Sequence, residues 1–492
     1  MSNQTKEHLH RSLAQIVGSR NLVVEKGELE EYSRAVLVIN PETPSLVTTT
    51  PTTVVRPAST SEVAAVVTLA DKNSIPVYVT SGGTELTGGA SPAADGILVD
   101  MDRMDRVLDI NEDAFTVTVE AACTLDVIER RLAIHKLRLG HIPMSIELGV
   151  TAAGAASNSG IGVECPGFET IVEQVMGMEV VLSSGDILRV KPVPKSATGH
   201  RNLAWLFLGT EGMHGIITEL TLRVRPFEPE NRRIDIVGFP SFEAAVRASY
   251  HLYRKGATAS MMFAMNRDRA LWCMPELTRF EDLHGVLALE FDGATTEIAS
   301  ALESFATSSL AEIQGRVLGR NLANNFRDNM FGNIPSHRVE LFSGQTGSAT
   351  TSFFDCDSVL QWHKDGQRIC SEYEVSLLGT AHLGPKYGFT AIVHGTSGSS
   401  KEDILRIIRC RYALTKRALE LGGCAEASHG VGLHNAYFLE EDLGARGLRL
   451  MQELKGVLDP HGILNPGKSW HRPADSADDG GESVRLVPDE SV

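Results

Sequence analysis

A short apolar segment runs straight into a loop crowded with glycine and hydroxyl side chains. The segment spans Ile75 to Val79, and the loop from Ser81 to Gly89 holds four glycines and three hydroxyl residues. The β-branched residues predict a strand that ends at the loop. Glycines let the main chain approach a ligand closely, and successive backbone N–H groups with nearby hydroxyls can bind phosphate oxygens. Because the loop lacks the G-x-G-x-x-G pattern of a Rossmann fold, it predicts either a different diphosphate site or an ordinary glycine-rich turn.

Two further glycine-rich stretches follow in the same region. Most residues from Gly149 to Gly162 are Gly, Ala, Ser or Thr, and the stretch from Leu206 to Thr218 holds three more glycines. A run without bulky side chains gives a core little to pack, but it lets a large flat ligand lie against the backbone. The repetition favours a binding site over unrelated turns.

The segments around these loops predict alternating helices and short strands. Ser59 to Glu62 has the pattern of a capping box before apolar residues at helical spacing, and a second helix is expected over 124–135. The strands are expected over 96–100, 115–119 and 179–182.

The domain organisation is predicted from changes in the length and type of segments along the chain. A proline-rich stretch at 226–229 predicts a boundary, so a first domain is expected over 51–226 and a second over 227–420. Residues 1–50 are expected to form a helical segment that packs on the first domain, and residues 421–470 to return to it. Residues 471–492 are acidic and polar with little to bury, which predicts a disordered tail.

Composition excludes several classes of function. The formal net charge is −16 and no basic stripe is present, so nucleic acid would be repelled. No apolar run approaches 18 residues, so no transmembrane segment is predicted and a cytoplasmic location is expected. The seven cysteines are scattered without a C-x-x-C pair, which predicts reduced thiols and no iron–sulfur cluster.

In order and spacing, the three glycine-rich segments resemble the FAD domain of the vanillyl alcohol oxidase and p-cresol methylhydroxylase (PCMH) superfamily. This superfamily includes D-lactate dehydrogenases, glycolate oxidase subunits and alkyl-dihydroxyacetone-phosphate synthases. The resemblance covers residues 50–226, and residues 459–468 are similar to the family's C-terminal return to the flavin domain. It implies an α+β protein, in which a PCMH-type FAD-binding domain of two subdomains is joined to a substrate (cap) domain with an antiparallel sheet.

The resemblance also implies FAD as the cofactor and a set of residues around it. The implied contacts are Ser81, Gly82, Gly83, Thr84, Glu85 and Leu86 on one side, Thr151, Gly154, Ser157, Gly160 and Gly162 on the other, and the backbone of Ile217. Members with a histidine-linked flavin in the first loop carry that histidine where this chain has Thr84. No link is therefore expected at that point, whereas attachment from the second domain stays open.

Two segments of the second half resemble the family's histidine-rich parts near the flavin. The first holds His382, Tyr387 and His394, but metal-binding relatives have a second histidine seven residues after the first, where this chain has a phenylalanine. The second holds His429 in a motif similar to Glu-His-Gly, with Ser428 in the place of the metal-binding glutamate. Because these ligands are replaced, no metal is expected.

Arg327 lies in a stretch similar to the family's Tyr-Leu-Arg-Asp, whose arginine binds an acidic substrate group. A guanidinium suits a carboxylate because it can bind both oxygens at once. The resemblance thus implies hydride transfer from a small hydroxylated substrate to flavin N5, with a 2-hydroxy acid favoured. His429 or His382 would be the base and Arg327 the carboxylate clamp.

Three other functions stay open at this point. They are the metal-independent oxidation of phenolic or other alcohols with help from Tyr387, non-redox flavin chemistry of the alkyl-dihydroxyacetone-phosphate synthase type, and a flavin-binding subunit of a larger complex. The electron acceptor is open between oxygen, a quinone, a cytochrome and another protein. A homodimer is one assembly that the sequence permits.

Overall fold

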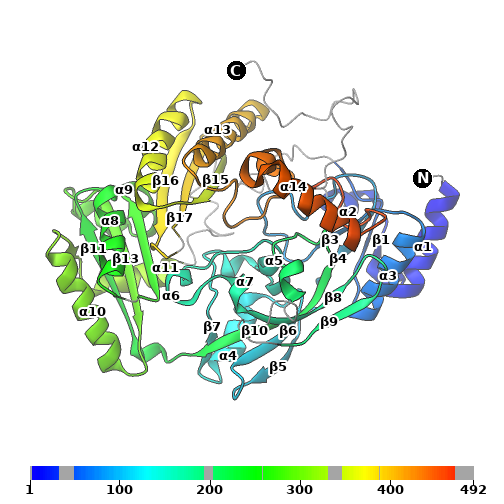
Figure 1. The fold of residues 1–492 in the computed structure, drawn as a ribbon, viewed down its shortest axis with the longest axis horizontal. Coiled ribbons are helices and arrows are strands. Elements are labelled where there is room, and N and C mark those ends of the chain that lie inside the picture. Colours follow the sequence, from blue (N-terminus) through cyan, green and yellow to red (C-terminus); the bar gives the residue numbers. More distant parts are fainter. Residues whose placement is uncertain are drawn as a thin grey trace.

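The computed structural model describes residues 3–32, 49–192, 203–257, 259–330, 346–386 and 388–470. These residues form three sheets divided between two lobes (Figure 1). The first lobe, on the right, extends to the end of the long strand β10 (Ile216–Pro226) and also carries the C-terminal helix α14 (Leu439–Leu458). The second lobe lies on the left. No helix in the described ranges is long and apolar enough to cross a membrane.

The first sheet of the first lobe has four strands in the order β1-β2-β4-β3. They are β1 (Leu22–Val23), β2 (Thr53–Val55), β3 (Val77–Thr80) and β4 (Ile97–Asp100), of which the last three are parallel. Helices α1 (Asn3–Val17) and α3 (Thr60–Lys72) pack together beside it, with α2 (Lys26–Glu31) further along the chain. The Ser59 side chain caps α3 by accepting from the backbone N–H of Glu62, as the capping pattern predicts.

The second sheet is antiparallel, with the order β5-β6-β10-β8-β9 and β7 paired to β10. The strands are β5 (Val107–Asn111), β6 (Thr116–Glu120), β7 (Leu137–Leu139), β8 (Val175–Val181), β9 (Ile187–Val190) and β10. Its helices are α4 (Leu125–Ala133), α5 (Ala152–Ser157), α6 (Cys165–Phe168) and α7 (Ile171–Gln174). The predicted strands and the second predicted helix correspond to β4, β6, β8 and α4 within a few residues.

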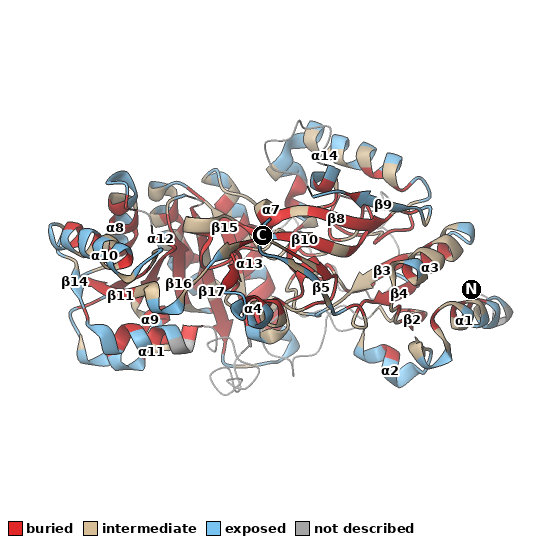
Figure 2. Ribbon diagram, turned by 90° about the horizontal axis from the view of Figure 1, so that it is seen from below, coloured by how far each residue is buried: buried red, intermediate tan, exposed pale blue. Residues whose placement is uncertain are grey.

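The second lobe is built on a seven-stranded antiparallel sheet. Its order is β14 (Arg316–Val317), β11 (Arg232–Phe239), β13 (Gly285–Asp292), β12 (Met261–Asn266), β16 (Ser376–Leu383), β17 (Phe389–Thr396) and β15 (Thr346–Phe353). Helices α8 (Phe242–Arg254), α10 (Thr296–Ala311), α12 (Cys356–Glu372) and α13 (Lys401–Glu420) bury apolar side chains with this sheet. Figure 2 shows that buried residues follow the strands of both lobes. The predicted α+β class with an antiparallel second sheet is confirmed.

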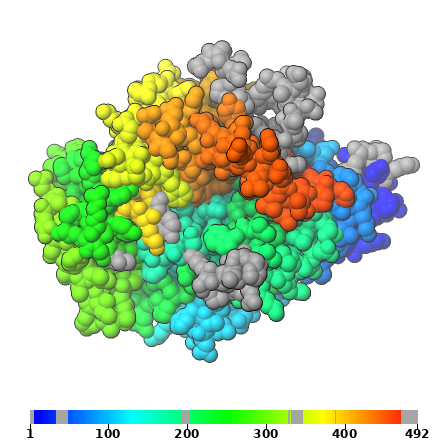
Figure 3. Space-filling view, in the orientation of Figure 1, coloured from blue at the N-terminus to red at the C-terminus, as the bar shows by residue number. Residues whose placement is uncertain are grey.

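The chain returns to the first lobe after α13. Beyond α14, the Val77 N–H donates to the Ile463 carbonyl, and the Asn465 N–H donates to the Val77 carbonyl, both at 2.7 Å, so this segment extends the edge of β3. The buried Lys455 ammonium donates to Asp459 and to the carbonyls of Met213 and Leu464. In Figure 3 this orange-red segment lies over the first lobe.

A buried group of charges joins the two lobes. Arg225, at the end of β10, donates to Glu164 of the first lobe at 2.7 Å and to Asp292 of the second lobe at 2.9 Å. Arg138 lies 2.8 Å from the same Glu164, and Arg232 pairs with Glu290. Of these pairs, Arg225 with Asp292 crosses from the first lobe to the second.

Candidate active site

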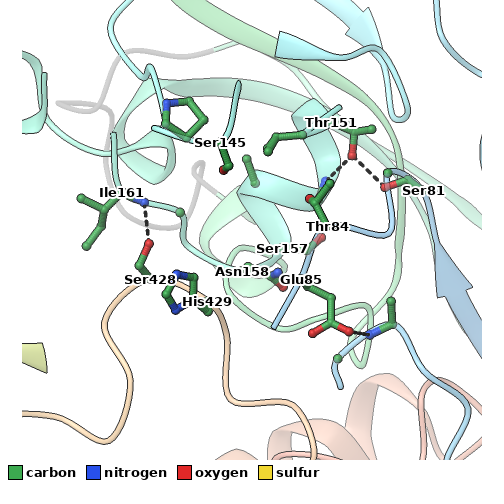
Figure 4. Close-up of a pocket in the computed structure, with 18 of the residues that line it drawn as sticks. Ser81, Thr84, Glu85, Ser145, Thr151, Ser157, Asn158, Ile161, Ser428 and His429 are labelled. Atoms are coloured by element: carbon green, nitrogen blue, oxygen red, sulfur yellow. Dashed lines mark hydrogen bonds between the residues drawn. The ribbon is translucent and has the colours of Figure 1, made fainter. Parts of the chain in front are cut away.

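The loop that follows β3 packs directly against the loop that precedes α5. The hydroxyls of Ser81 and Thr151 lie 2.7 Å apart, and Thr151 caps α5 by accepting from the Gly154 N–H at 3.2 Å (Figure 4). A β-carbon on Gly82 would lie 2.4 Å from the Gly149 carbonyl oxygen, so only glycine allows this approach. The two glycine-rich segments that the sequence singled out therefore form one continuous surface.

This surface is a wall of a large cavity that extends between the lobes. About 1600 Å³ of space is free of protein atoms there, part of it open to solvent. All of the residues that the sequence assigned to FAD line this cavity except Leu86 and Gly162. The Leu86 carbonyl instead accepts from Arg411 at 3.5 Å, while Gly162 packs where a β-carbon would meet the Ile142 N–H at 2.7 Å.

The C-terminal segment brings His429 to the same cavity. Figure 4 shows His429 beside Ser428, whose hydroxyl accepts from the Ile161 N–H at 3.2 Å. Just beyond, the buried carboxylate of Glu211 accepts from the N–H groups of Val431 and Gly432. Burial raises the pKa of Glu211 to about 7, although these donors favour the carboxylate. These contacts fix the position of His429 relative to the glycine loops.

Glu426 stands behind His429 as the centre of a buried polar cluster. Its carboxylate lies 3.3 Å from His429 Nδ1, 3.2 Å from the Arg411 guanidinium and 3.2 Å from the Asn435 amide, and it also accepts from Thr351. Burial alone would raise the pKa of Glu426, but the charges of His429 and Arg411 lower it to about 2. The Glu426 carboxylate is thus ionised at neutral pH. Because Nδ1 of His429 lies next to Glu426, the other ring nitrogen can bind a ligand.

The structure corrects the expectation that His382 and His394 face the active site. Both are fully buried on the opposite side of the sheet, where His382 stacks on Tyr250 and His394 lies 3.2 Å from the Thr350 hydroxyl. Side chains alternate along a strand, so it is the odd-numbered residues of β16 and β17, including Leu383 and Phe389, that line the cavity. Burial lowers the pKa of both histidines to about 3. Tyr387 lies outside the described residues.

Arg327 is also placed away from the cavity. It lies on α11 (Arg320–Met330), whose apolar face buries Leu322, Ala323 and Phe326. Arg327 itself lies on the exposed side of this helix. There Arg327 lines a separate depression together with Arg232, Arg233 and Arg320. The carboxylate clamp that the sequence assigned to Arg327 therefore has no support in this arrangement.

Two residues that sequence reasoning missed do line the cavity. His141 is 1% exposed, neither ring nitrogen has a hydrogen-bond partner, and burial lowers its pKa to about 3. Arg269, on α9 (Arg267–Cys273), is 5% exposed. His141 packs against Gly160 and Gly162 of the second glycine-rich segment but lies eight residues before that segment begins, and no local pattern marks either His141 or Arg269.

These features fit a bound dinucleotide with a flat aromatic ring system. The walls are bare where Gly82 and α5 lie, hydroxyls of Ser81 and Thr84 line one end, and the unpartnered nitrogens of His141 can hydrogen-bond to a ligand. Within the described ranges, no group of three or more His, Cys, Asp or Glu side chains could hold a metal ion. The fold and the cavity therefore suit the two-domain FAD-binding protein that the sequence predicts.

Comparisons with known proteins identify both domains. Residues 51–191 match the family described as "FAD binding domain", and residues 228–469 match the family described as "FAD linked oxidases, C-terminal domain". The chain therefore belongs to the FAD-linked oxidoreductases that combine these two domains, and its cofactor is FAD.

Individual relatives agree with this assignment. Glycolate oxidase subunit GlcD of Bacillus subtilis is 27% identical over 437 residues, which covers 86% of this chain and 90% of the relative. The D-lactate dehydrogenase of Archaeoglobus fulgidus is 26% identical, with 89% and 98% covered. Among solved structures, 4-ethylphenol oxidase from Gulosibacter chungangensis has a TM-score of 0.77 at 19% identity, with 96% of this chain and 98% of that one covered. This last likeness shows the shared PCMH-type fold.

Proposed function

We propose that the chain oxidises a 2-hydroxy acid to the corresponding 2-oxo acid, with His429 as the base. The observation that carries this proposal is the position of His429, which opens onto the FAD cavity and is backed by the ionised Glu426. Relatives named as D-lactate dehydrogenases and as a glycolate oxidase subunit support the same substrate class.

The reaction breaks one O–H bond and one C–H bond of the substrate. His429 takes the hydroxyl proton on the ring nitrogen that faces away from Glu426, and the carboxylate of Glu426 stabilises the imidazolium that results. FAD, when bound, supplies the acceptor for the hydride that leaves the substrate carbon. The apolar face of β16 and β17 keeps water away from the reacting carbon.

In this proposal the hydrogen-bonding and charged groups come from the protein itself, without a metal ion. Ser428 occupies the place of the metal-binding glutamate in the motif that this segment resembles. Its hydroxyl instead accepts a hydrogen bond from the Ile161 N–H at 3.2 Å. We therefore expect EDTA treatment followed by desalting to leave the rate of flavin reduction unchanged. A loss of activity that zinc or manganese restores would contradict this assignment.

The first experiment is anaerobic mixing of the FAD-loaded protein with a panel of substrates. We expect glycolate, both enantiomers of lactate, or larger 2-hydroxy acids to bleach the flavin band at about 450 nm. Bleaching by 4-alkylphenols or phenolic alcohols alone would replace the proposal by phenol oxidation. Activity that appears only after a second protein is added would identify the chain as a subunit, as the name of the Bacillus subtilis relative describes it.

A further inference from the structure

The backbone holds Arg269 firmly at the edge of the cavity. Asn266, at the end of β12, caps α9 by accepting from the Arg269 N–H at 3.0 Å, and the same amide oxygen accepts from the Thr380 N–H of β16 at 3.1 Å. Gly379 lies so close that a β-carbon there would be 2.8 Å from Arg269 Cβ. The position of this arginine is therefore set by three elements of the second lobe.

The Arg269 side chain carries a buried charge without a counter-ion among the described residues. Its guanidinium lies 4.2 Å from the ring centroid of Trp272 and 4.0 Å from the Met144 sulfur, and Nε has no hydrogen-bond partner. The other two arginines buried to the same degree each pair with a carboxylate, Arg138 with Glu164 at 2.8 Å and Arg411 with Glu426 at 3.2 Å. Burial lowers the pKa of Arg269.

Burying a guanidinium without a partner costs free energy unless a ligand pairs with it. The indole face of Trp272 compensates part of that cost, but Nε has no partner and Nη2 contacts only the Met144 sulfur, so the guanidinium donors have no oxygen acceptor among the described residues. Those donors match the two oxygens of a carboxylate. Among the described residues that line the cavity, Arg269 is the sole lysine or arginine.

We propose that Arg269 binds the carboxylate of the substrate, and that the substrate is a 2-hydroxy monocarboxylic acid with an apolar side chain. This inference rests on the proposed function and names its substrate class. The second lobe's contribution to the same cavity is mainly apolar and comes from Ala349, Leu383, Phe389, Ala391 and Val393. With one cation and an apolar wall, the site has a partner for one carboxylate and would leave a second one desolvated and unpaired.

The test compares the variant R269M with the wild type on paired substrates. Flavin reduction is measured anaerobically with phenyllactate and mandelate, with their neutral amides, and with the dicarboxylate 2-hydroxyglutarate. We expect R269M to lose about 100-fold in the second-order rate of flavin reduction with the acids and to change by less than about threefold with the amides. We expect R269K to recover part of the loss, because it restores the charge without the fork.

A matched control separates this arginine from the one that the sequence favoured. R327M makes the same chemical change on α11, outside the cavity, and should leave the preference for acids over amides unchanged. Where R269M shows no turnover, the dissociation constant of 3-phenylpropanoate, read from the perturbed flavin spectrum, replaces the rate; it should also rise about 100-fold.

The outcomes distinguish this inference from the proposed function. If no 2-hydroxy acid reduces the wild-type flavin, the proposed function fails and Arg269 is not needed to explain it. The acids could react with the wild type while R269M lowers the rate of flavin reduction equally for acids and amides, or alters only flavin binding. Arg269 would then not bind the substrate carboxylate. A wild type that prefers 2-hydroxyglutarate to mandelate and phenyllactate would overturn the apolar monocarboxylate assignment.

Discussion

Replacing Glu426 by glutamine should damage both the activity and the stability of the protein. Glu426 is 1% exposed at its side chain and contacts His429, Arg411, Asn435 and Thr351. Glutamine keeps the shape and one carbonyl acceptor but removes the negative charge. The Arg411 guanidinium then loses the carboxylate that balances it, and so does the imidazolium that His429 becomes in the proposed reaction.

The magnitude of the stability effect follows from the pKa of Glu426. Its ordinary value of 4.5 falls to about 2 in the folded protein, and at about 1.4 kcal/mol per pH unit the ionised form is favoured by about 3 kcal/mol. A carboxyl whose pKa is lowered on folding stabilises the protein above about pH 4.5 and loses this contribution as the pH falls towards 2. E426Q should therefore be about 3 kcal/mol less stable than the wild type at pH 7, and the difference should narrow below about pH 5.

Urea unfolding and stopped-flow flavin reduction measure the two effects separately. We expect the rate of flavin reduction to fall about 100-fold in E426Q with the flavin still bound, because a base contributes about 10²- to 10⁴-fold and His429 loses its support. E441Q, the same change at an exposed residue in the first turn of α14, should alter neither quantity. A folded, flavin-loaded E426Q that reduces its flavin at the wild-type rate would refute the role assigned to Glu426.

Two further changes test how the fold builds the site. G82A places a β-carbon 2.4 Å from the Gly149 carbonyl, so the flavin content per protein, read at about 450 nm, should fall, whereas G27A, with open space around it, should keep the wild-type content. D292N removes one of the two carboxylates that pair with Arg225 between the lobes and should lower the free energy of unfolding by about 3 kcal/mol. An unchanged urea midpoint for D292N would mean that Glu164 alone satisfies Arg225.

The cofactor half of the site was readable from the sequence because its chemistry is local. The loop at Ser81 and the stretch from Gly149 to Gly162 are short segments in which residue size alone decides what can lie against the backbone. Strand β3 delivers the first loop to the cavity, and Thr151 caps the helix that shapes the second. Both cues lie in consecutive residues and can be recognised without the tertiary structure, whereas the individual FAD contacts were implied by the resemblance to the family and stay predictions.

The substrate-binding residues could not be predicted in the same way, because their role depends on which face of the sheet lines the cavity. Strands β16 and β17 are covered on both sides, by helices on one and by the cavity on the other, so apolar residues occupy both faces. Polar residues such as His382 and His394 do alternate with apolar ones, but here the polar face is buried against the helices and the apolar face lines the cavity. The alternation therefore suggested the wrong side for the histidines. Arg327 and Arg269 posed the same problem on helices, where one step along the chain moves a side chain from the buried side to solvent.

The two sets of charges in the cavity have complementary roles in the proposed reaction. Arg269 lacks a counter-ion, so it favours a ligand that brings one negative charge. The Glu426 carboxylate already lies 3.3 Å from His429 Nδ1 and 3.2 Å from Arg411 before any ligand arrives, so it is in place to balance the proton that His429 takes in the proposed reaction. An anionic alcohol satisfies the first group on binding and the second on reaction. A neutral alcohol would leave Arg269 unpaired throughout, which is why the comparison of acids with amides probes the substrate class more directly than the removal of His429 does.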